Sequence, residues 1–128
     1  MGAYLGNRLV GIAYGSINNK NSGVILNGLA VIFSQWRKGM GSNLLRFFEE
    51  RARKSGFRSV SLGCGEGSTE LFYLKNCYRP IEIQAKAKDG RILATEKVRG
   101  YSDGLSKRER LREKLRPMET IFIFEKQL

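Results

Sequence analysis

Arg37-Lys38-Gly39-Met40-Gly41-Ser42 predicts much of the fold, because of the residues that precede and follow it. Residues 24–33 before it are almost wholly apolar, as expected of a strand that is covered on both faces. After it, apolar residues recur with a helical period, and Gly56 stands where a helix would end. The sequence therefore predicts a buried strand, a glycine-rich turn and an amphipathic helix.

The helix after the turn is expected to have two faces. The apolar face would consist of Leu44, Leu45, Phe48 and Ala52. The polar face would consist of Arg46, Glu49, Glu50, Arg53 and Lys54. We expect the apolar face to pack on a sheet and the polar face to meet solvent.

The glycine-rich turn is the strongest candidate site in the sequence. Gly39 and Gly41 would let a ligand approach the backbone, and the start of the helix offers unpaired N–H groups and a partial positive charge. Arg37 and Lys38 add charge beside it. This pattern favours a phosphate or pyrophosphate, while a tight turn that binds nothing is an equal alternative. It matches neither the Walker P-loop nor the three-glycine dinucleotide fingerprint.

Apolar periodicity and turn residues place the other elements. The sequence predicts strands at 3–5, 9–17 and 57–64, helices at 68–77 and 106–116, strands within 81–97, and a last strand at 120–124. Pro80 is expected to end the helix at 68–77. Successive strand–helix–strand units imply one α/β domain with a partly parallel sheet.

Composition narrows the chemistry. The 128 residues include no histidine, which excludes Ser-His-Asp and Cys-His catalysis and any zinc site that needs histidine. Cys64 and Cys77 are too few and too far apart for a metal site or a disulfide framework, although a single bridge between them stays open. No apolar run approaches the roughly 20 residues that span a bilayer, and no signal peptide is seen, so we expect a cytoplasmic protein without membrane contact.

The net charge of +11 and the pI near 10.1 predict an anionic partner. Residues 1–48 carry no acidic side chain, whereas residues 75–116 carry thirteen basic and six acidic ones. Three explanations stay open: an ordinary soluble surface, a nucleic-acid or ribosomal partner, and a phosphate-bearing ligand.

The charged helix at 106–116 is the densest part of this basic segment. Its apolar face would be formed by Leu105, Leu111 and Leu115. Its basic face would be formed by Lys107, Arg108, Arg110, Arg112, Lys114 and Arg116. The helix either docks with this face in solvent or draws an anionic substrate toward the site.

Two motifs give the chain a resemblance to a known family. Leu29-Ala30-Val31, followed by residues 37–42 and a Leu-Leu helix, resembles the GNAT N-acetyltransferases, in which an L-A-V strand leads into R/Q-x-x-G-x-G/A. Residues 71–80, which read Leu-Phe-Tyr-Leu-Lys-Asn-Cys-Tyr-Arg-Pro, look like the F-Y-x-K-x-G-F segment of that family. The resemblance covers residues 9–83 and 120–128.

The resemblance implies an α/β fold with a mixed, partly parallel central sheet and flanking helices. It also implies acetyl-CoA as cosubstrate, and direct transfer of the acetyl group to an amine without a metal. The backbone of Leu29, Ala30 and Val31 would pair with the pantetheine arm like an added strand. The pyrophosphate would be held by Trp36, Arg37, Lys38, Gly39, Met40, Gly41 and Ser42. Tyr73 would be the general acid that protonates the leaving thiolate.

The chain departs from the family pattern in several places. Trp36 occupies the first position of the glycine motif, and Cys77 stands where a glycine is frequent. The strands at 24–33 and 57–64 carry no acid that could deprotonate an amine. Glu66, and after it Glu82, are the remaining candidates for a base. No covalent intermediate is expected, because neither cysteine has an activating histidine.

The resemblance also bears on the two ends of the fold. Relatives usually carry a strand and two helices before the first hairpin, so we expect a chain that lacks them to cover its open strand edge in a homodimer. Residues 86–118 are expected to be a basic insertion before the last strand, near the acceptor site. Two alternatives to the enzyme stay open: a catalytically weak CoA-binding module, and a basic protein associated with nucleic acid or the ribosome.

Overall fold

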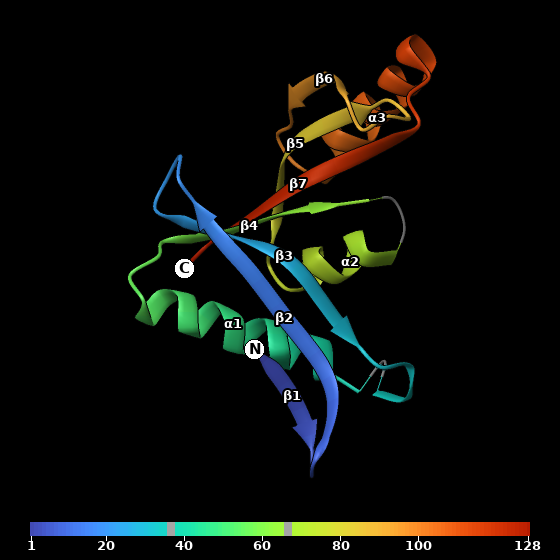
Figure 1. Cartoon of the computed structure of the whole chain (residues 1–128). Helices are drawn as coiled ribbons and strands as arrows, with labels where there is room; N and C mark the ends of the chain where they lie inside the picture. The colour runs from blue at the N-terminus through green and yellow to red at the C-terminus, as the bar shows by residue number, and fades with distance from the viewer. Residues whose placement is uncertain (36–37, 66–67) are drawn as a thin grey trace. The chain divides into compact units, whose positions relative to one another are not determined.

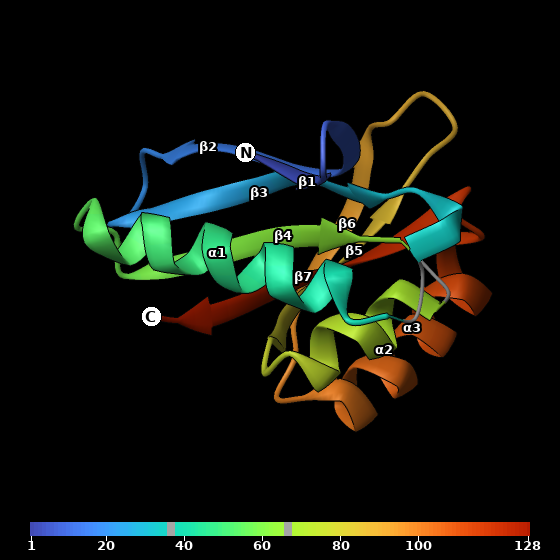
Figure 2. The same ribbon diagram turned by 90° about the horizontal axis from the view of Figure 1, so that it is seen from below.

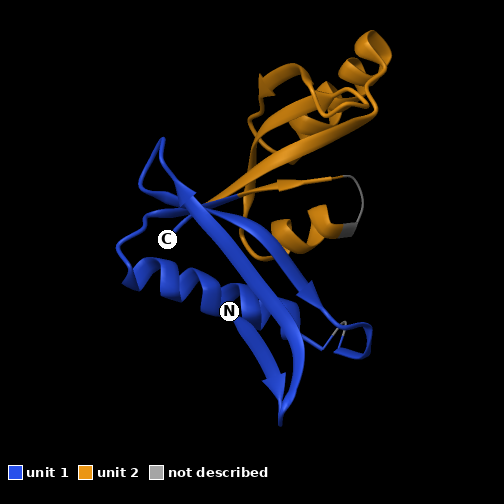
Figure 3. Cartoon of the chain, in the orientation of Figure 1, with its two compact units in different colours: residues 1–61, 127–128 blue, residues 62–126 orange. Residues whose placement is uncertain are grey.

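The computed structural model of the chain describes residues 1–35, 38–65 and 68–128. They divide into two units, shown in Figure 3: unit 1 holds residues 1–61 and 127–128, and unit 2 holds residues 62–126. The strands are hydrogen-bonded in the order β1-β2-β3-β4-β7-β5-β6. No helix in this described part is long and apolar enough to cross a membrane.

Unit 1 begins with an antiparallel meander (Figure 1). Its strands are β1 (Gly2–Leu5), β2 (Arg8–Asn18) and β3 (Gly23–Val31), followed by the start of β4 (Ser59–Cys64). β2 and β3 pair from Gly11↔Val31 to Asn18↔Gly23, and β4 runs parallel to β3. The expected mixed, partly parallel sheet is therefore confirmed.

A helix covers one face of the β2–β3 pair, as Figure 2 shows. After the short 3-10 helix η1 (Phe33–Gln35), α1 spans Met40–Lys54. Leu44, Leu45 and Ala52 are buried, as the apolar period predicts. Glu49 was expected on the polar face but is only 4% exposed. That prediction was wrong because Glu49 follows Leu45 by one helical turn and so shares its face.

The end of α1 was predicted at the right residue. Gly56 has a φ of 90°, the left-handed conformation that suits glycine. The N–H groups of Gly56 and Phe57 donate to the carbonyls of Arg53 and Ala52 at 3.0 Å, the hydrogen-bond pattern of a Schellman motif. The chain can therefore turn directly from α1 into β4.

Unit 2 holds the other helices and strands. They are α2 (Ser68–Lys75), β5 (Arg79–Lys86), β6 (Ile92–Lys97), α3 (Tyr101–Leu115) and β7 (Glu119–Gln127). β5 is antiparallel to both β6 and β7, and α3 packs against β5. Phe122, Phe124 and Ile83 are fully buried and form the centre of this unit.

Pro80 was expected to end a helix, but it does not. α2 ends at Lys75, and Pro80 is the second residue of β5, where the register with β7 shifts. A proline is tolerated there because an irregular strand position leaves no ladder N–H to replace. The turn out of α2 is made by Cys77, whose φ is 69°.

The charged helix differs most from the sequence-based expectation. α3 begins at Tyr101, five residues before the predicted start, and its buried residues are Gly104, Arg108 and Leu111. Leu105, expected on the apolar face, is 40% exposed, and Arg108, expected on the outward basic face, is buried. A Cβ on Gly104 would lie 2.5 Å from Phe122 Cε1, so the absence of a side chain there brings this face of the helix close to β7.

The prediction of a single domain with an insertion at 86–118 stays a prediction. β6 and α3 occupy that segment between β5 and β7.

Candidate functional site

The N-terminus of α1 has the local structure that the glycine motif predicted. Gly39 is its N-cap residue, with φ 80° and ψ 1°, and no side chain among the described residues caps the helix. The first intrahelical bond runs from the Asn43 N–H to the Gly39 carbonyl at 3.0 Å, so the N–H groups of residues 40–42 have no acceptor within the helix. No acidic residue lies in the first turn. The helix end therefore keeps its partial positive charge available to an anion.

The other residues predicted to hold a pyrophosphate are placed as follows. Lys38 is exposed beside the cap, and Met40, Gly41 and Ser42 form the first turn of α1. Trp36 and Arg37 lie outside the described residues.

β3 offers a strand edge close to this helix end. Its register with β4 covers only Gly23–Ile25, and over residues 26–30 the described register partners of β3 all belong to β2. A Cβ built on Gly11 would lie 3.1 Å from the Ala30 carbonyl oxygen and 3.2 Å from a Leu44 methyl group. The end of β3 and the first turns of α1 are thus neighbours. An exposed edge of this kind accepts amide groups as an added strand does.

A β-bulge interrupts the pairing of β2 with β3 just beyond the residues of β3 that pair with β4. Tyr14 faces Gly28 and Gly15 faces Leu26, which leaves Asn27 as an extra residue in β3. Bulges bend a strand and increase its twist. The ring of Tyr14 lies over Gly28, where a Cβ would come within 2.3 Å of it. The sequence held the signal, since a glycine within an apolar strand indicates a bulge or a close approach.

Tyr73 lies on α2 in unit 2. Its ring is half-buried among Tyr78 and Phe124, with ring centroids 5.6 and 6.2 Å away. Burial, and to a smaller extent the nearby Cys64 thiol, raises the pKa of Tyr73 to about 12. No described residue forms a hydrogen bond with its hydroxyl. Tyr73 is therefore neutral at pH 7 and free to donate.

Both cysteines are free thiols, so the alternative of a Cys64–Cys77 bridge is not realised. Cys64 is buried, and its Sγ lies 3.3 Å from Thr69 Oγ1. Burial raises the pKa of the Cys64 thiol, an effect that the Thr69 hydrogen bond partly offsets. A protonated, buried thiol is a poor nucleophile.

The two candidate bases have different outcomes. Glu66 lies outside the described residues. Glu82 is half-buried on β5, where its Oε1 accepts a hydrogen bond from Gln84 Nε2 at 3.0 Å. Among the described residues, no group of three Cys, Asp or Glu side chains could hold a metal ion.

Sequence reasoning missed Glu70, the most deeply buried carboxylate among the described residues of unit 2. It is 2% exposed, accepts a hydrogen bond from the Tyr101 hydroxyl at 2.8 Å, and forms an ion pair with Arg108. In the sequence, an acid in the first turn of a helix indicates only a favourable dipole interaction. Its partners are 31 and 38 residues away, which a local pattern does not reveal.

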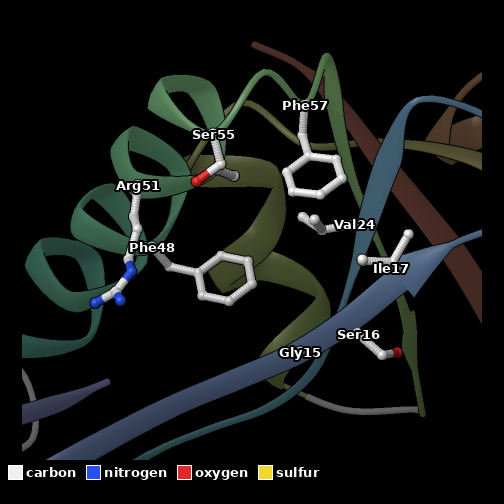
Figure 4. Close-up of a pocket in the computed structure, with 9 residues that line it drawn as sticks. Gly15, Ser16, Ile17, Val24, Phe48, Arg51, Ser55 and Phe57 are labelled. Carbon is white, nitrogen blue, oxygen red and sulfur yellow. The ribbon is translucent and has the colours of Figure 1, made fainter.

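A cavity of about 240 Å³ lies elsewhere in unit 1 (Figure 4). It is lined by Gly15, Ser16, Ile17, Val24, Phe48, Arg51, Ala52, Ser55 and Phe57. These residues belong to the C-terminal half of α1, to the turn that follows it, and to β2 and β3, whereas Gly39 caps the opposite end of a helix about 22 Å long. The cavity is therefore separate from the candidate anion site.

A family model described as the acetyltransferase (GNAT) family matches residues 1–77. The chain belongs to this family. No curated protein matches this GNAT protein over its sequence. The candidate residues divide between the units: residues 29–31 and 38–42 lie in unit 1, and Tyr73 and Glu82 lie in unit 2.

Solved acetyltransferase structures share the fold. A Bacillus subtilis acetyltransferase in complex with CoA has a TM-score of 0.69 and 20% identity, over 99% of this chain and 74% of that one. An aminoglycoside 6'-N-acetyltransferase complexed with coenzyme A has a TM-score of 0.69 and 14% identity, over 98% and 70%. An IAA acetyltransferase from Bacillus cereus has a TM-score of 0.68 and 16% identity, over 99% and 75%. Identities this low show the fold and leave the substrate to be argued from the site.

Proposed function

We propose that this GNAT protein transfers an acetyl group from acetyl-CoA directly to an amine. The observation that carries the proposal is the uncapped N-terminus of α1, where Gly39 adopts a left-handed conformation beside the open edge of β3. Family membership supports acetyl transfer in general. The CoA named in two of the similar structures supports acetyl-CoA as the donor.

The residues of unit 1 fit the donor in two respects. The three N–H groups at residues 40–42, which have no acceptor within the described part of the helix, suit a pyrophosphate, and Lys38 adds an exposed positive charge. The amide-bearing pantetheine arm suits the β3 edge at Leu29 and Ala30. From the family motif we also assign Val31 to the pantetheine arm, and Trp36 and Arg37 to the pyrophosphate. When bound, acetyl-CoA supplies an activated thioester.

Tyr73 is proposed to act on the leaving sulfur. With a pKa of about 12, its hydroxyl holds the proton more tightly than a thiol of ordinary pKa near 8.5. Complete transfer of that proton to a thiolate is thus uphill by about 3.5 pKa units. We infer that Tyr73 stabilises the developing charge by donating a hydrogen bond, and that the sulfur takes its proton later from solvent.

The amine must lose a proton before or after it attacks. Glu66 stays our first proposal for the base and Glu82 the second. The acceptor is proposed to be a small molecule or a protein amine. A homodimer and a nucleic-acid or ribosomal partner stay predictions.

A turnover screen tests the proposal. Release of the CoA thiol would be followed with acetyl-CoA against simple amines, aminoglycosides and peptides with free N-termini. Release that depends on the amine and saturates with acetyl-CoA supports the enzyme. Tight CoA binding without release for any amine would favour the binding module instead.

A further inference from the structure

The buried ion pair between α2 and α3 is the feature of unit 2 that acetyl transfer does not itself require. The Glu70 and Arg108 side chains are 2% and 10% exposed, and Arg108 Nη2 donates to Glu70 Oε2. The Tyr101 hydroxyl donates to Glu70 Oε1 at 2.8 Å. Both carboxylate oxygens are thereby held by groups from α3.

Stability alone is a weak reason for this arrangement. Removing two charges from water costs about as much as their attraction returns, and apolar residues of similar volume often serve as well. Moreover, Arg108 Nε is buried without a hydrogen-bond partner among the described residues. Unlike apolar packing, a hydrogen-bonded ion pair fixes the orientation of the two elements that it joins.

Here the ion pair fixes the orientation of α2, the helix that carries Tyr73. α2 has only eight residues, and a helix of this length is not stable by itself in water. Its position must therefore come from contacts with its surroundings. Glu70 and Tyr73 are three residues apart and so lie on the same face of α2.

A row of aromatic rings connects the ion pair to Tyr73 a second time. The Arg108 guanidinium lies 4.5 Å from the centroid of the Phe122 ring. The Phe122 and Phe124 centroids are 5.9 Å apart, and those of Phe124 and Tyr73 are 6.2 Å apart. Tyr101 also packs on Phe122, at 5.8 Å. The face of α3 that carries Arg108 thus binds the Glu70 side chain of α2 directly, and it reaches the Tyr73 ring through Phe122 and Phe124.

We propose that Glu70, Arg108 and Tyr101 are positioning residues that brace α2 and so hold the Tyr73 hydroxyl in place for acetyl transfer. The inference rests on the proposed role of Tyr73. It gives the charged helix α3 a task at the site that needs no contact between α3 and the acceptor.

A double-mutant design tests the brace. Arg108→Met removes the ion pair, and E70Q/R108M removes it without leaving a buried charge unpaired, in case the single variant does not fold. Each is made in the wild type and in Tyr73→Phe. Since small displacements of a catalytic group cost much of its effect, kcat should fall about tenfold in the wild type and less than about twofold in Tyr73→Phe. KM for acetyl-CoA should not change. An equal loss in both backgrounds, or no loss, overturns the inference.

Hydrogen exchange gives a readout that does not need turnover. Amides of residues 71–75 should exchange about tenfold faster in E70Q/R108M, while those of α1 do not change. Arg110→Met is the matched control, because Arg110 pairs with Glu96 on the exposed side of the same helix. If the wild type acetylates nothing, the proposed function fails, but hydrogen exchange still shows whether the ion pair holds α2 in place. Unchanged exchange in residues 71–75 overturns the inference whatever the turnover.

Discussion

Tyr73→Phe is the substitution that isolates the chemistry best, because it removes one oxygen and keeps the ring. The ring contacts with Tyr78 and Phe124 do not involve the hydroxyl, and no described residue bonds to it. The fold should therefore be retained. What is lost is a hydrogen bond to a sulfur that becomes charged in the transition state.

The size of the effect follows from that bond. A hydrogen bond to a charged group contributes about 1.5–3 kcal/mol, which corresponds to a loss of about 10- to 150-fold in kcat. The assay is thiol release at saturating acetyl-CoA, with the Kd for CoA measured by calorimetry. The Kd should stay within about twofold, since the interaction forms only in the transition state. Tyr4→Phe, on the exposed strand β1, controls for loss of a tyrosine hydroxyl. Equal kcat in wild type and Tyr73→Phe would make Tyr73 a packing residue and refute the reasoning.

Three further predictions concern stability and charge. Tyr73 has a pKa of about 12 in the folded protein against an ordinary 10, so its contribution to stability should be complete below pH 10 and lost as the pH rises from about 10 to about 12. Alkaline unfolding of Tyr73→Phe should lack this part of the loss of stability. Identical unfolding curves for the two proteins would contradict the raised pKa of Tyr73. Cys77→Gly should raise the melting temperature by a few degrees, because the left-handed φ of 69° costs a non-glycine residue about 1 kcal/mol; a lower melting temperature would contradict it. Reversing the exposed Arg112 and Lys114 to glutamate should change kcat/KM for a small neutral amine by less than about twofold, whereas a selective loss with an acidic peptide at low salt would restore a capture role for α3.

The parts of the structure that the sequence predicted well are those specified by neighbouring residues. Gly39 and Gly56 each sit at a helix end with a positive φ, and both were expected there. The mixed sheet followed from alternating strands and helices, and the family from two short motifs. Local chemistry is enough for such features because a turn or cap involves only a few consecutive residues.

What could not be predicted depends on partners far away in the chain. Arg108 was expected in solvent with the other basic residues of α3. Nothing near it in sequence indicates that it would be buried in an ion pair with Glu70. Glu49 was misplaced for a different, local reason: its polarity suggested solvent, although its spacing of one helical turn from Leu45 placed it on the buried face. A charged residue can be expected in solvent only where the core holds no oppositely charged partner for it.

Titration of acetyl-CoA into matched glycine variants tests whether CoA is bound at the N-terminus of α1. Gly39 and Gly90 have φ values of 80° and 84°, and a Cβ on either would meet no atom of the described residues within 4 Å. Alanine should therefore strain both backbones alike, by about 1–2 kcal/mol. Only Gly39 opens the helix that is proposed to hold the pyrophosphate.

Gly39→Ala should raise the Kd for acetyl-CoA by about tenfold or more, because a displaced turn misdirects the N–H groups of residues 40–42. Gly90→Ala should bind as the wild type does. Gly41→Val, which puts a branched side chain in the first turn of α1, should weaken binding as well. A folded Gly39→Ala variant with the affinity of the wild type would contradict the claim that CoA is held at the N-terminus of α1.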